Sequence, residues 1–339
     1  MAYPIEIRSL SHGFAGKKGE NRRMLYEDAG LVVPEGDVFV LLGKNGIGKS
    51  TLLKTIAGIE KIQQGDILIG GDSIRDLPSK EMAELISYVS TDIVRISNLS
   101  VHDMVAIGRS PHTNWIGKLT GEDMGIVNRS LDMVGMASFA GRDFGTLSDG
   151  ERQRVMIARA LAQDSHIILL DEPTAFLDVP NKYETALLLR RLARELGKTV
   201  VFSTHDLNLA LRLADTVCVM DGGKFYTGAP EDMLLDGEIS RIFSGTKLDY
   251  DIRSGDVKFT EPQTGLIFLD SPQEYYVLLE HALERYGIGL SEDPFHPKKL
   301  KASGGATGSI ELKLTDGNNE HEFRSVGDLL SFIRKSGLS

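Results

Sequence analysis

The stretch GKNGIGKST, residues 43–51, limits the possible folds of this chain more than any other part of the sequence. It fits the pattern G-x-x-x-x-G-K-[ST] and follows VFVLL, residues 38–42, a continuous apolar run of the kind found in buried strands. Glycines at these positions let the backbone turn tightly and direct its N–H groups at phosphates, while the lysine supplies a positive charge. The stretch therefore predicts a nucleotide-binding loop between a strand and a helix.

The residues of this loop that we expect to bind ATP are Gly43, Lys44, Asn45, Gly46, Gly48, Lys49, Ser50 and Thr51. Lys49 is expected to contact the β- and γ-phosphates, and Ser50 to offer its hydroxyl to Mg²⁺. A second polar pair follows the apolar run IILL, residues 167–170: Asp171 is placed to hold Mg²⁺ through water, and Glu172 to polarise an attacking water as general base. Alone, such carboxylates are more often surface groups at a strand end, but together with the loop they predict ATP hydrolysis.

The order of the apolar runs predicts an α/β fold. Runs typical of buried strands, such as those beginning at His166 and Lys198, alternate with stretches whose apolar residues are three and four positions apart, as in helices. We therefore expect a largely parallel sheet whose strand ends carry the ligand site. From about residue 90 to 164 the pattern is mostly helical, and after about residue 249 it becomes that of a small α+β unit.

A second glycine turn lies in TLSDGERQRV, residues 146–155, where another helix is expected to begin. The Ser148 hydroxyl, the Gly150 N–H and the positive end of the helix dipole form a site for an anion, yet no local phosphate-binding element accompanies them. N-capping of the helix by Ser148 or Asp149 is the alternative, although it leaves the glycine unexplained. The anion is therefore expected to come from elsewhere.

The composition of the chain argues against some classes of function. A net charge of −10 argues against non-specific nucleic-acid binding, which needs an excess of Lys and Arg. No uninterrupted apolar stretch approaches the roughly 20 residues that a membrane span needs, so any membrane crossing would belong to another chain. The single cysteine, Cys218, lies in the apolar run TVCVM and is expected to be a buried strand thiol.

Short motifs together resemble the ATPase subunits of ABC transporters over roughly residues 5–244. LSDGE, residues 147–151, is similar to the family signature LSGGQ and is followed by the usual RQR-x-x-IARAL. FLD, residues 176–178, resembles the D-loop, and STHD, residues 203–206, resembles the switch region. The resemblance implies that His205 contacts the γ-phosphate, that Asp178 is one of the nucleotide-binding residues, and that Phe14 stacks on adenine. An isolated Phe at that position is otherwise more often a core residue.

The same resemblance implies a P-loop core in which a mostly parallel sheet is joined by an antiparallel β part and an inserted helical subdomain at about residues 92–164. The ABC ATPase domain would span residues 1–248, and a C-terminal accessory α+β domain residues 249–339. In such ATPases two subunits pair head to tail, and each signature faces the γ-phosphate held by its partner. We therefore expect a homodimer in which Ser148 and Gly150 of one chain contact the ATP of the other.

The resemblance also implies where the protein acts and with which partners. We expect a peripheral protein at the cytoplasmic face of the cell membrane, bound to a polytopic permease and connected indirectly to a substrate-binding protein, with no nucleic acid as partner. The expected cofactors are ATP and Mg²⁺.

Two motifs depart from the family pattern. Asp149 and Glu151 replace the usual Gly and Gln of the signature, and YVST, residues 88–91, stands where the family commonly has YVPQ. The missing glutamine helps to ligate Mg²⁺ and links the site to the membrane partner. Thr91 offers a hydroxyl and Asp92 a carboxylate, and either is a candidate partial substitute.

Residues 101–123 resemble the importer ATPases for iron–siderophore complexes, haem and cobalamin, in which GR-x-P is followed by a loop with a tryptophan. Trp115 is that tryptophan here, and packing within the helical subdomain is its alternative role. We therefore expect the ATP-hydrolysing motor of such an importer. The alternatives are a transporter of another substrate class, a soluble ABC ATPase acting on nucleic acid, and an inert regulator. The complete set Lys49, Asp171, Glu172 and His205 opposes the last of these.

Overall fold

The computed structural model describes residues 3–14, 23–92, 96, 98–113, 118–260, 263–304 and 310–336. The chain forms two compact units, Met1–Ser244 and Gly245–Ser339, which are described separately. Trp115 lies outside the described residues. Within the described part of the chain, no helix combines the length and the apolar character needed to cross a membrane.

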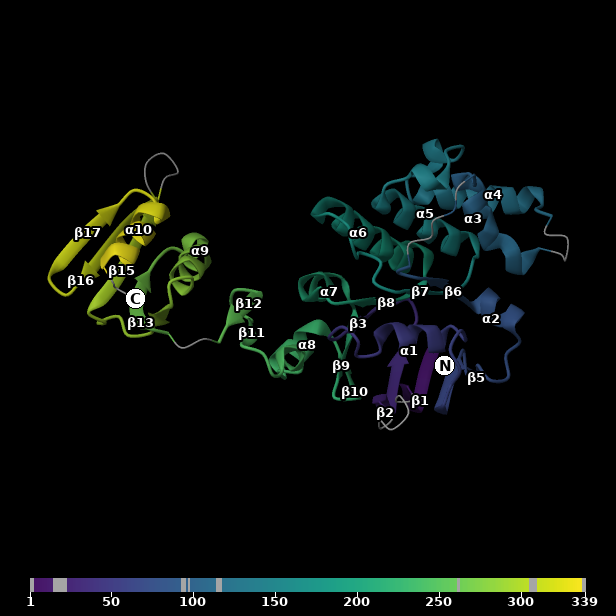
Figure 1. The fold of residues 1–339 in the computed structure, drawn as a ribbon, viewed down its shortest axis with the longest axis horizontal. Helices are drawn as coiled ribbons and strands as arrows, with labels where there is room; N and C mark the ends of the chain where they lie inside the picture. The colour runs from purple at the N-terminus through teal and green to yellow at the C-terminus, as the bar shows by residue number, and fades with distance from the viewer. Residues whose placement is uncertain are drawn as a thin grey trace. The chain divides into compact units, whose positions relative to one another are not determined.

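The first unit is organised around a six-stranded sheet (Figure 1). Its strands, in spatial order, are β10 (Lys224–Gly228), β9 (Thr216–Asp221), β3 (Val38–Leu42), β8 (Thr199–Thr204), β7 (Ile167–Leu170) and β6 (Ile86–Val89). All neighbouring pairs are parallel except β10 with β9. Every residue of β3 and β7 is buried, which explains why both read as continuous apolar runs rather than alternating ones.

A four-stranded antiparallel sheet belongs to the same unit. Its spatial order is β2 (Arg23–Val33), β1 (Ile5–Phe14), β4 (Gln64–Ile69) and β5 (Asp72–Ser73). Helix α1 (Lys49–Ile56) contributes Leu52, Leu53 and Ile56 to a core that also contains side chains of both sheets. Cys218 is buried in this core, as expected, and burial raises the pKa of its thiol. The core therefore holds the phosphate loop against both sheets.

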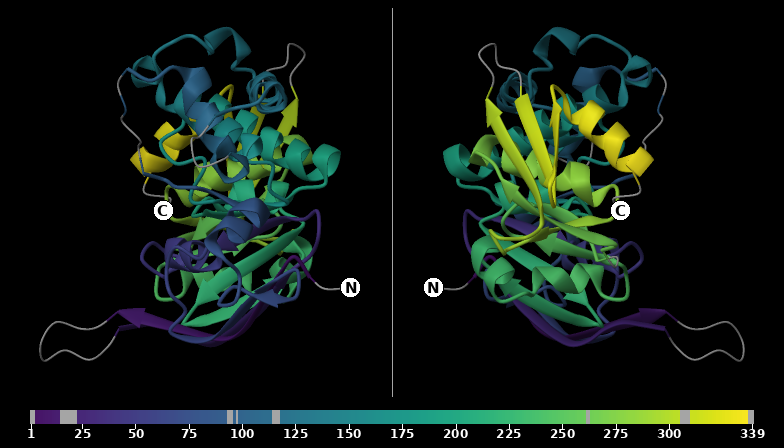
Figure 2. Two further views of the ribbon diagram at one scale, coloured as in Figure 1. Left: turned by 90° about the vertical axis from the view of Figure 1, so that its right-hand side faces the viewer. Right: turned by 90° about the vertical axis from the view of Figure 1, so that its left-hand side faces the viewer.

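The segment after β6 is helical. It contains α3 (Val101–Ala106), the 3₁₀ turns Ile107–His112, Ala137–Phe139 and Phe144–Thr146, α4 (Gly121–Met133) and α5 (Asp149–Ala162). These helices gather at one end of the unit, and β1 and β2 lie at the other (Figures 1 and 2). A buried ion pair holds them: Arg109 Nε donates to Asp123 Oδ1 at 2.8 Å, and Arg109 Nη1 donates to the Ala162 carbonyl at 2.8 Å. The GR-x-P stretch thus ties the 3₁₀ turn Ile107–His112 to α4 and α5.

The remaining helices of the first unit lie on the connections outside this helical segment. They are α2 (Ser79–Leu85), α6 (Val179–Leu196), α7 (Leu207–Leu213), α8 (Pro230–Leu235) and the 3₁₀ turn Ile239–Phe243. Gly197 follows the last residue of α6, and its φ of 63° gives the left-handed cap that glycine favours.

The second unit is an α+β unit with its own core. A hairpin of β11 (Leu248–Asp251) and β12 (Asp256–Phe259) precedes a five-stranded sheet of β14 (Ile288–Ser291), β13 (Gly265–Asp270), β15 (Lys298–Gly304), β16 (Ile310–Asp316) and β17 (Asn319–Phe323). Helices α9 (Gln273–Glu284) and α10 (Val326–Ser336) bury Leu279, Leu283, Leu329 and Ile333 in one cluster with the sheet. The sequence indicated both helices and β15 to β17, but β11, β12, β13 and β14 were not expected.

Candidate functional site

The phosphate loop joins β3 to α1, and its shape depends on two glycines. Gly46 and Gly48 have φ angles of 75° and 112°, in the left-handed region that glycine adopts without strain. Gly48 directly precedes α1, and no side chain of the described residues caps this helix start. The N–H groups at the start of α1 are therefore available to an anion.

Lys49 lies deep in the loop, with a side chain that is 5% exposed. Its Nζ donates to the Gly43 carbonyl at 2.8 Å and lies 3.7 Å from Glu172 Oε1. Burial lowers the pKa of the Lys49 ammonium, while the Glu172 and Asp171 carboxylates oppose that shift. The two carboxylates favour the charged form of the ammonium, and a buried cation of this kind is suited to bind a highly charged anion such as a triphosphate.

Asp171 joins three segments at the strand ends. Its Oδ1 accepts hydrogen bonds from Ser50 Oγ at 2.9 Å and from Ser203 Oγ at 2.7 Å. Its main-chain carbonyl accepts from Thr91 Oγ1 at 2.8 Å. The strand register explains this meeting, because β7 pairs in parallel with both β6 and β8, so that all three strands end at the same edge.

Glu172 occupies a strained backbone position beside Asp171. Its φ is 44°, which non-glycine residues rarely adopt, and its N–H donates to Ser203 Oγ at 2.9 Å. Its Oε2 lies 3.0 Å from His205 Nδ1, and its Oε1 faces Lys49. The carboxylate is thus held between a cation and an imidazole at the mouth of the phosphate loop.

Of these groups, Lys49, Ser50, Thr91 and Glu172 line a cavity of about 430 Å³. The described residues that line it are Phe14, Leu25, Asn45, Gly46, Gly48, Lys49, Ser50, Thr51, Thr91 and Glu172. The Phe14 ring is 51% exposed at the end of β1, so it is not a core residue. Phe14, Glu172 and six of the eight predicted loop residues therefore share one cavity, whereas Gly43 and Lys44 are not among its described lining residues.

The second glycine turn has a different environment. Ser148 caps α5, and its N–H and hydroxyl both donate to Glu151 Oε2, at 2.7 and 2.8 Å, while the Glu151 N–H donates back to Ser148 Oγ. These bonds lower the pKa of the Glu151 carboxyl. Asp149 pairs with Arg152 at 2.9 Å. The start of α5 is therefore already capped by a carboxylate of its own chain.

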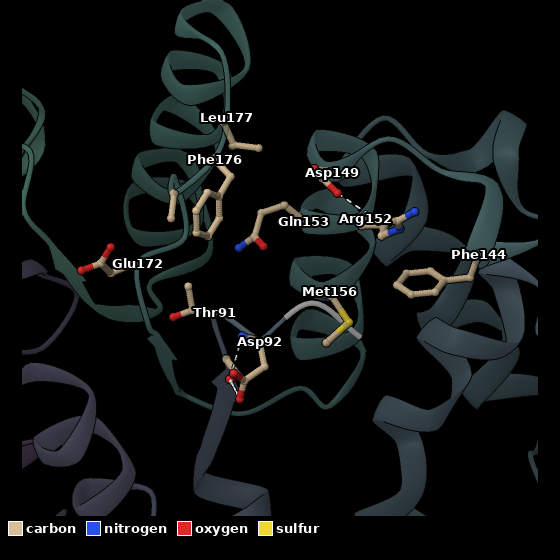
Figure 3. A pocket seen from close by; sticks show the side chains of 12 residues that line it. Thr91, Asp92, Phe144, Asp149, Arg152, Gln153, Met156, Glu172, Phe176 and Leu177 are labelled. Carbon is tan, nitrogen blue, oxygen red and sulfur yellow. Dashed lines mark hydrogen bonds and ion pairs between the residues drawn. The ribbon is translucent and has the colours of Figure 1, made fainter. Parts of the chain in front are cut away.

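A narrow cleft lies between α5 and the strand ends. Its described lining is Ser90, Thr91, Asp92, Phe144, Asp149, Arg152, Gln153, Met156, Glu172, Ala175, Phe176 and Leu177. Figure 3 shows Gln153 and Met156 projecting from α5 toward Thr91 and Asp92. Thr91 and Glu172 line both this cleft and the phosphate-loop cavity. The cleft therefore adjoins the position where the family commonly has glutamine.

The ABC transporter family matches residues 26–175 of this chain. An ABC transporter ATP-binding protein of Methanocaldococcus jannaschii is 39% identical over 233 residues, which cover 68% of this chain and 80% of the relative.

The chain belongs to the ABC transporter ATP-binding protein family.

Two further relatives bear on this ABC ATPase. An iron(3+)-hydroxamate import ATP-binding protein of Bacillus subtilis is 38% identical, covering 60% of this chain and 76% of the relative. A cobalamin import ATP-binding protein of Halobacterium salinarum is 34% identical, covering 95% of this chain and 77% of the relative. The latter match extends over most of the second unit.

Solved structures agree with the family assignment. A metal-chelate type ABC transporter in an inward-facing conformation matches with a TM-score of 0.61 and 31% identity, over 72% of this chain and 89% of that chain. A dimeric ATP-binding cassette in a post-hydrolysis state, bound to ADP and Pi, matches with a TM-score of 0.59 and 29% identity, over 67% of this chain and 98% of that chain. These findings confirm the predicted family, the predicted fold class and the predicted ATPase activity.

The predicted site residues fall into two groups in this ABC ATPase. Phe14, the phosphate loop, Thr91, Asp171, Glu172 and His205 converge at one edge of the sheet. Among the described residues that line the phosphate-loop cavity, by contrast, none is Ser148, Gly150 or Asp178. Asp178 instead caps α6, where its side chain accepts from the Asn181 N–H at 3.1 Å.

Sequence reasoning missed two residues of this region. Ser203 donates to Asp171 Oδ1 and accepts from the Glu172 N–H, but no role was predicted for it beyond its place in the STHD motif. Its signal was its place near the end of an apolar strand, one of several whose polar extensions were expected to converge. Asn181, which contacts Asp178, had no signal in the sequence.

Proposed function

We propose that this ABC ATPase is the motor subunit of an importer, for which iron–siderophore complexes and cobalamin are the favoured cargoes. The relatives named for hydroxamate and cobalamin import support both cargoes. The cobalamin relative carries additional weight because its match covers 95% of this chain, including most of the unit after Ser244. Residues 1–248 would form the ATPase domain and residues 249–339 an accessory domain.

The observation that carries the proposal is the arrangement of Glu172. Its carboxylate lies 3.7 Å from Lys49 Nζ and 3.0 Å from His205 Nδ1, at the mouth of the phosphate-loop cavity. We infer that Lys49 binds the β- and γ-phosphates and that Glu172 accepts a proton from the attacking water. His205 orients that carboxylate and contacts the γ-phosphate. Phe14, exposed at the rim, offers a face for adenine to stack on.

The donor set fits Mg²⁺. Ser50 Oγ and Asp171 Oδ1 are oxygen ligands 2.9 Å apart, and the Thr91 hydroxyl lies at the same edge. Ser50 and Asp171 would hold the ion, with Thr91 as a further oxygen donor. When bound, Mg²⁺ neutralises charge on the β- and γ-phosphate oxygens. The described residues contain no cluster of three or more His, Cys, Asp or Glu that could hold a metal, so the phosphates would complete its coordination.

The working state would be a head-to-tail homodimer at the cytoplasmic face of the membrane, in which the Ser148 and Gly150 turn completes the partner's site. A polytopic permease would be the direct partner, and a substrate-binding protein an indirect one. The adjoining cleft beside Thr91 and Gln153 is the proposed contact for a short helix of the permease.

Reconstitution tests this proposal. The chain is co-purified with the permease encoded beside its gene, placed in vesicles, and assayed for ATP-dependent uptake of labelled ferric siderophore, haem and cobalamin. We expect uptake of a siderophore complex or of cobalamin, and loss of uptake in the Glu172→Gln variant. ATP hydrolysis with no uptake of any of the three would contradict the cargo assignment.

A further inference from the structure

The geometry points to Asn181 as a positioning residue that holds the D-loop and the signature turn together, so that both reach the partner's ATP as one unit. This inference rests on the proposed head-to-tail dimer and goes beyond the residues assigned to it above. It is carried by hydrogen bonds and a close approach that all lie within the first unit.

Asn181 is bound to the D-loop on one side. Asp178 Oδ1 accepts from the Asn181 N–H at 3.1 Å and from Asn181 Nδ2 at 2.7 Å. The main-chain bond is an ordinary N-cap of α6, whereas the side-chain bond is additional. It uses the second lone pair of the carboxylate oxygen to fix the rotamer of Asp178.

On its other side, Asn181 is bound to the helix that carries the signature turn. Asn181 Oδ1 accepts from Arg154 Nη2 at 3.1 Å, and Arg154 also pairs with Glu184. Arg154 lies in α5, one turn after Gly150. The amide of Asn181 therefore donates to one partner-facing loop and accepts from the helix that bears the other.

Close packing adds a contact that involves no hydrogen bond. A Cβ placed on Gly150 would lie 3.2 Å from Asn181 Cγ, tighter than ordinary van der Waals contact. Gly150, which N-capping alone does not explain, therefore allows α5 to approach α6 at this point. With a side chain at position 150, either the turn or Asn181 would have to move.

The Asn181 bridge would couple the movements of the D-loop and the signature turn, which the capping of α5 alone would not do. Because Asp178 and the Ser148–Gly150 turn are joined, a displacement of either one is transmitted to the other. Asn181 itself does not line the phosphate-loop cavity among the described residues, so its loss should not disturb ATP binding by its own chain. The expected defect is in closure onto the partner's ATP.

The test uses the full-length chain with Asn181→Ala, and with Glu184→Gln as the matched control. Glu184→Gln weakens the other bond of Arg154 but leaves the Asn181 bridge intact. In the Glu172→Gln background, we expect Asn181→Ala to weaken ATP-driven dimerisation about tenfold, since a hydrogen bond to a charged group is lost. In a chain that keeps Glu172, we expect Asn181→Ala to lower kcat to a similar degree. Binding of ATP by the separate chain and the effect of Glu184→Gln should stay within about twofold.

A second variant covers the case in which Asn181→Ala folds poorly. Asn181→Asp keeps the size and the acceptor for Arg154 but places a carboxylate against that of Asp178, so it should impair closure at least as strongly. The inference is overturned if both variants close as tightly as the parent, or if closure falls only in proportion to the chain's own ATP affinity. A parent chain that fails to dimerise with ATP would instead contradict the proposed dimer, and the inference would fall with it.

Discussion

Two helices of the ATPase unit begin at glycine-containing turns, and their surroundings differ. Helix α1 begins after Gly48 without a side-chain cap, with the buried Lys49 ammonium at its start. Helix α5 begins after Ser148 and is closed by the carboxylate of Glu151 from the same chain. Both ends offer N–H groups and the positive end of a helix dipole.

The difference indicates how far each site is complete within one chain. The α1 turn has a cation, two carboxylates, an exposed aromatic ring and a cavity, all supplied by one chain, and it is the proposed ATP site. The α5 turn has its own carboxylate where an anion would bind, so a phosphate must compete with Glu151 or bind at the remaining N–H groups. The assignment of the α5 turn to the partner's nucleotide therefore stays a prediction from the family resemblance, and the Glu151 cap is the contact that a phosphate would have to displace or avoid.

The largest expected effect concerns chemistry at the α1 site. Glu172→Gln should lower turnover by about 10³-fold, because general-base contributions are of that order, while ATP binding persists and a closed dimer accumulates. The measurement is single-turnover hydrolysis together with size-exclusion chromatography in ATP. Glu195→Gln, an exposed change in the last turn of α6, is the control. Hydrolysis by Glu172→Gln at a near wild-type rate would remove Glu172 from its role.

Lys49→Ala should act one step earlier, on binding itself. Loss of a charge-assisted contact to the triphosphate should weaken ATP affinity about 10- to 100-fold. Lys54→Ala, in the last turn of the same helix, should leave affinity unchanged. Equilibrium binding of a fluorescent ATP analogue to the isolated chain distinguishes the two, and equal affinities for Lys49→Ala and wild type would refute the assignment.

The α5 turn is expected to respond to acid through its cap. The pKa of Glu151 is lowered in the folded chain, so the stability it contributes is present above its unfolded value of about 4.3 and is lost as pH falls through the folded value. Glu151→Gln should lower the free energy of unfolding by about 1 kcal/mol at pH 7. Between pH 5 and 3 the wild type should lose roughly this capping contribution, whereas the stability of the variant should depend less on pH. Urea unfolding of both proteins across this range measures it. Glu122→Gln in α4 is the control, because Asp123, not Glu122, caps that helix.

The smallest effect is expected from the second unit. A chain truncated after Ser244 should retain hydrolysis within about twofold when paired with its permease, because the residues proposed for catalysis all lie before that point. The unit would serve in dimer contacts, with ligand-dependent inhibition as the alternative. Dimer affinity without ATP, measured for both lengths, separates these roles. Failure of a folded truncated chain to hydrolyse ATP would contradict dispensability.

The convergence of the polar residues that follow apolar strands could be predicted from the sequence, because neighbouring parallel strands end at the same edge of a sheet. Asp171 and Glu172 were found in this way, whereas Lys49 was found from the phosphate-loop pattern. The contacts that define their geometry could not be predicted: the two bonds of Ser203 depend on the register of β8 against β7, and those of Asn181 on how closely α5 approaches α6. Glu151 was identified as a departure, but its bonds to Ser148 emerged only from the structure.

The central claim is that each ATP is bound between the phosphate loop of one chain and the α5 turn of the other. Mixed dimers of a Lys49→Ala chain and a Ser148→Arg chain test it most directly. Each homodimer has two defective sites, whereas the mixed dimer has one site with both changes and one with neither. Hydrolysis and ATP-driven closure should therefore reappear on mixing. They should not reappear when a chain carrying both changes is mixed with wild type, since each site then holds one change. A Ser148→Arg homodimer that folds, closes and hydrolyses ATP normally would contradict the claim and leave the α5 turn as a helix cap.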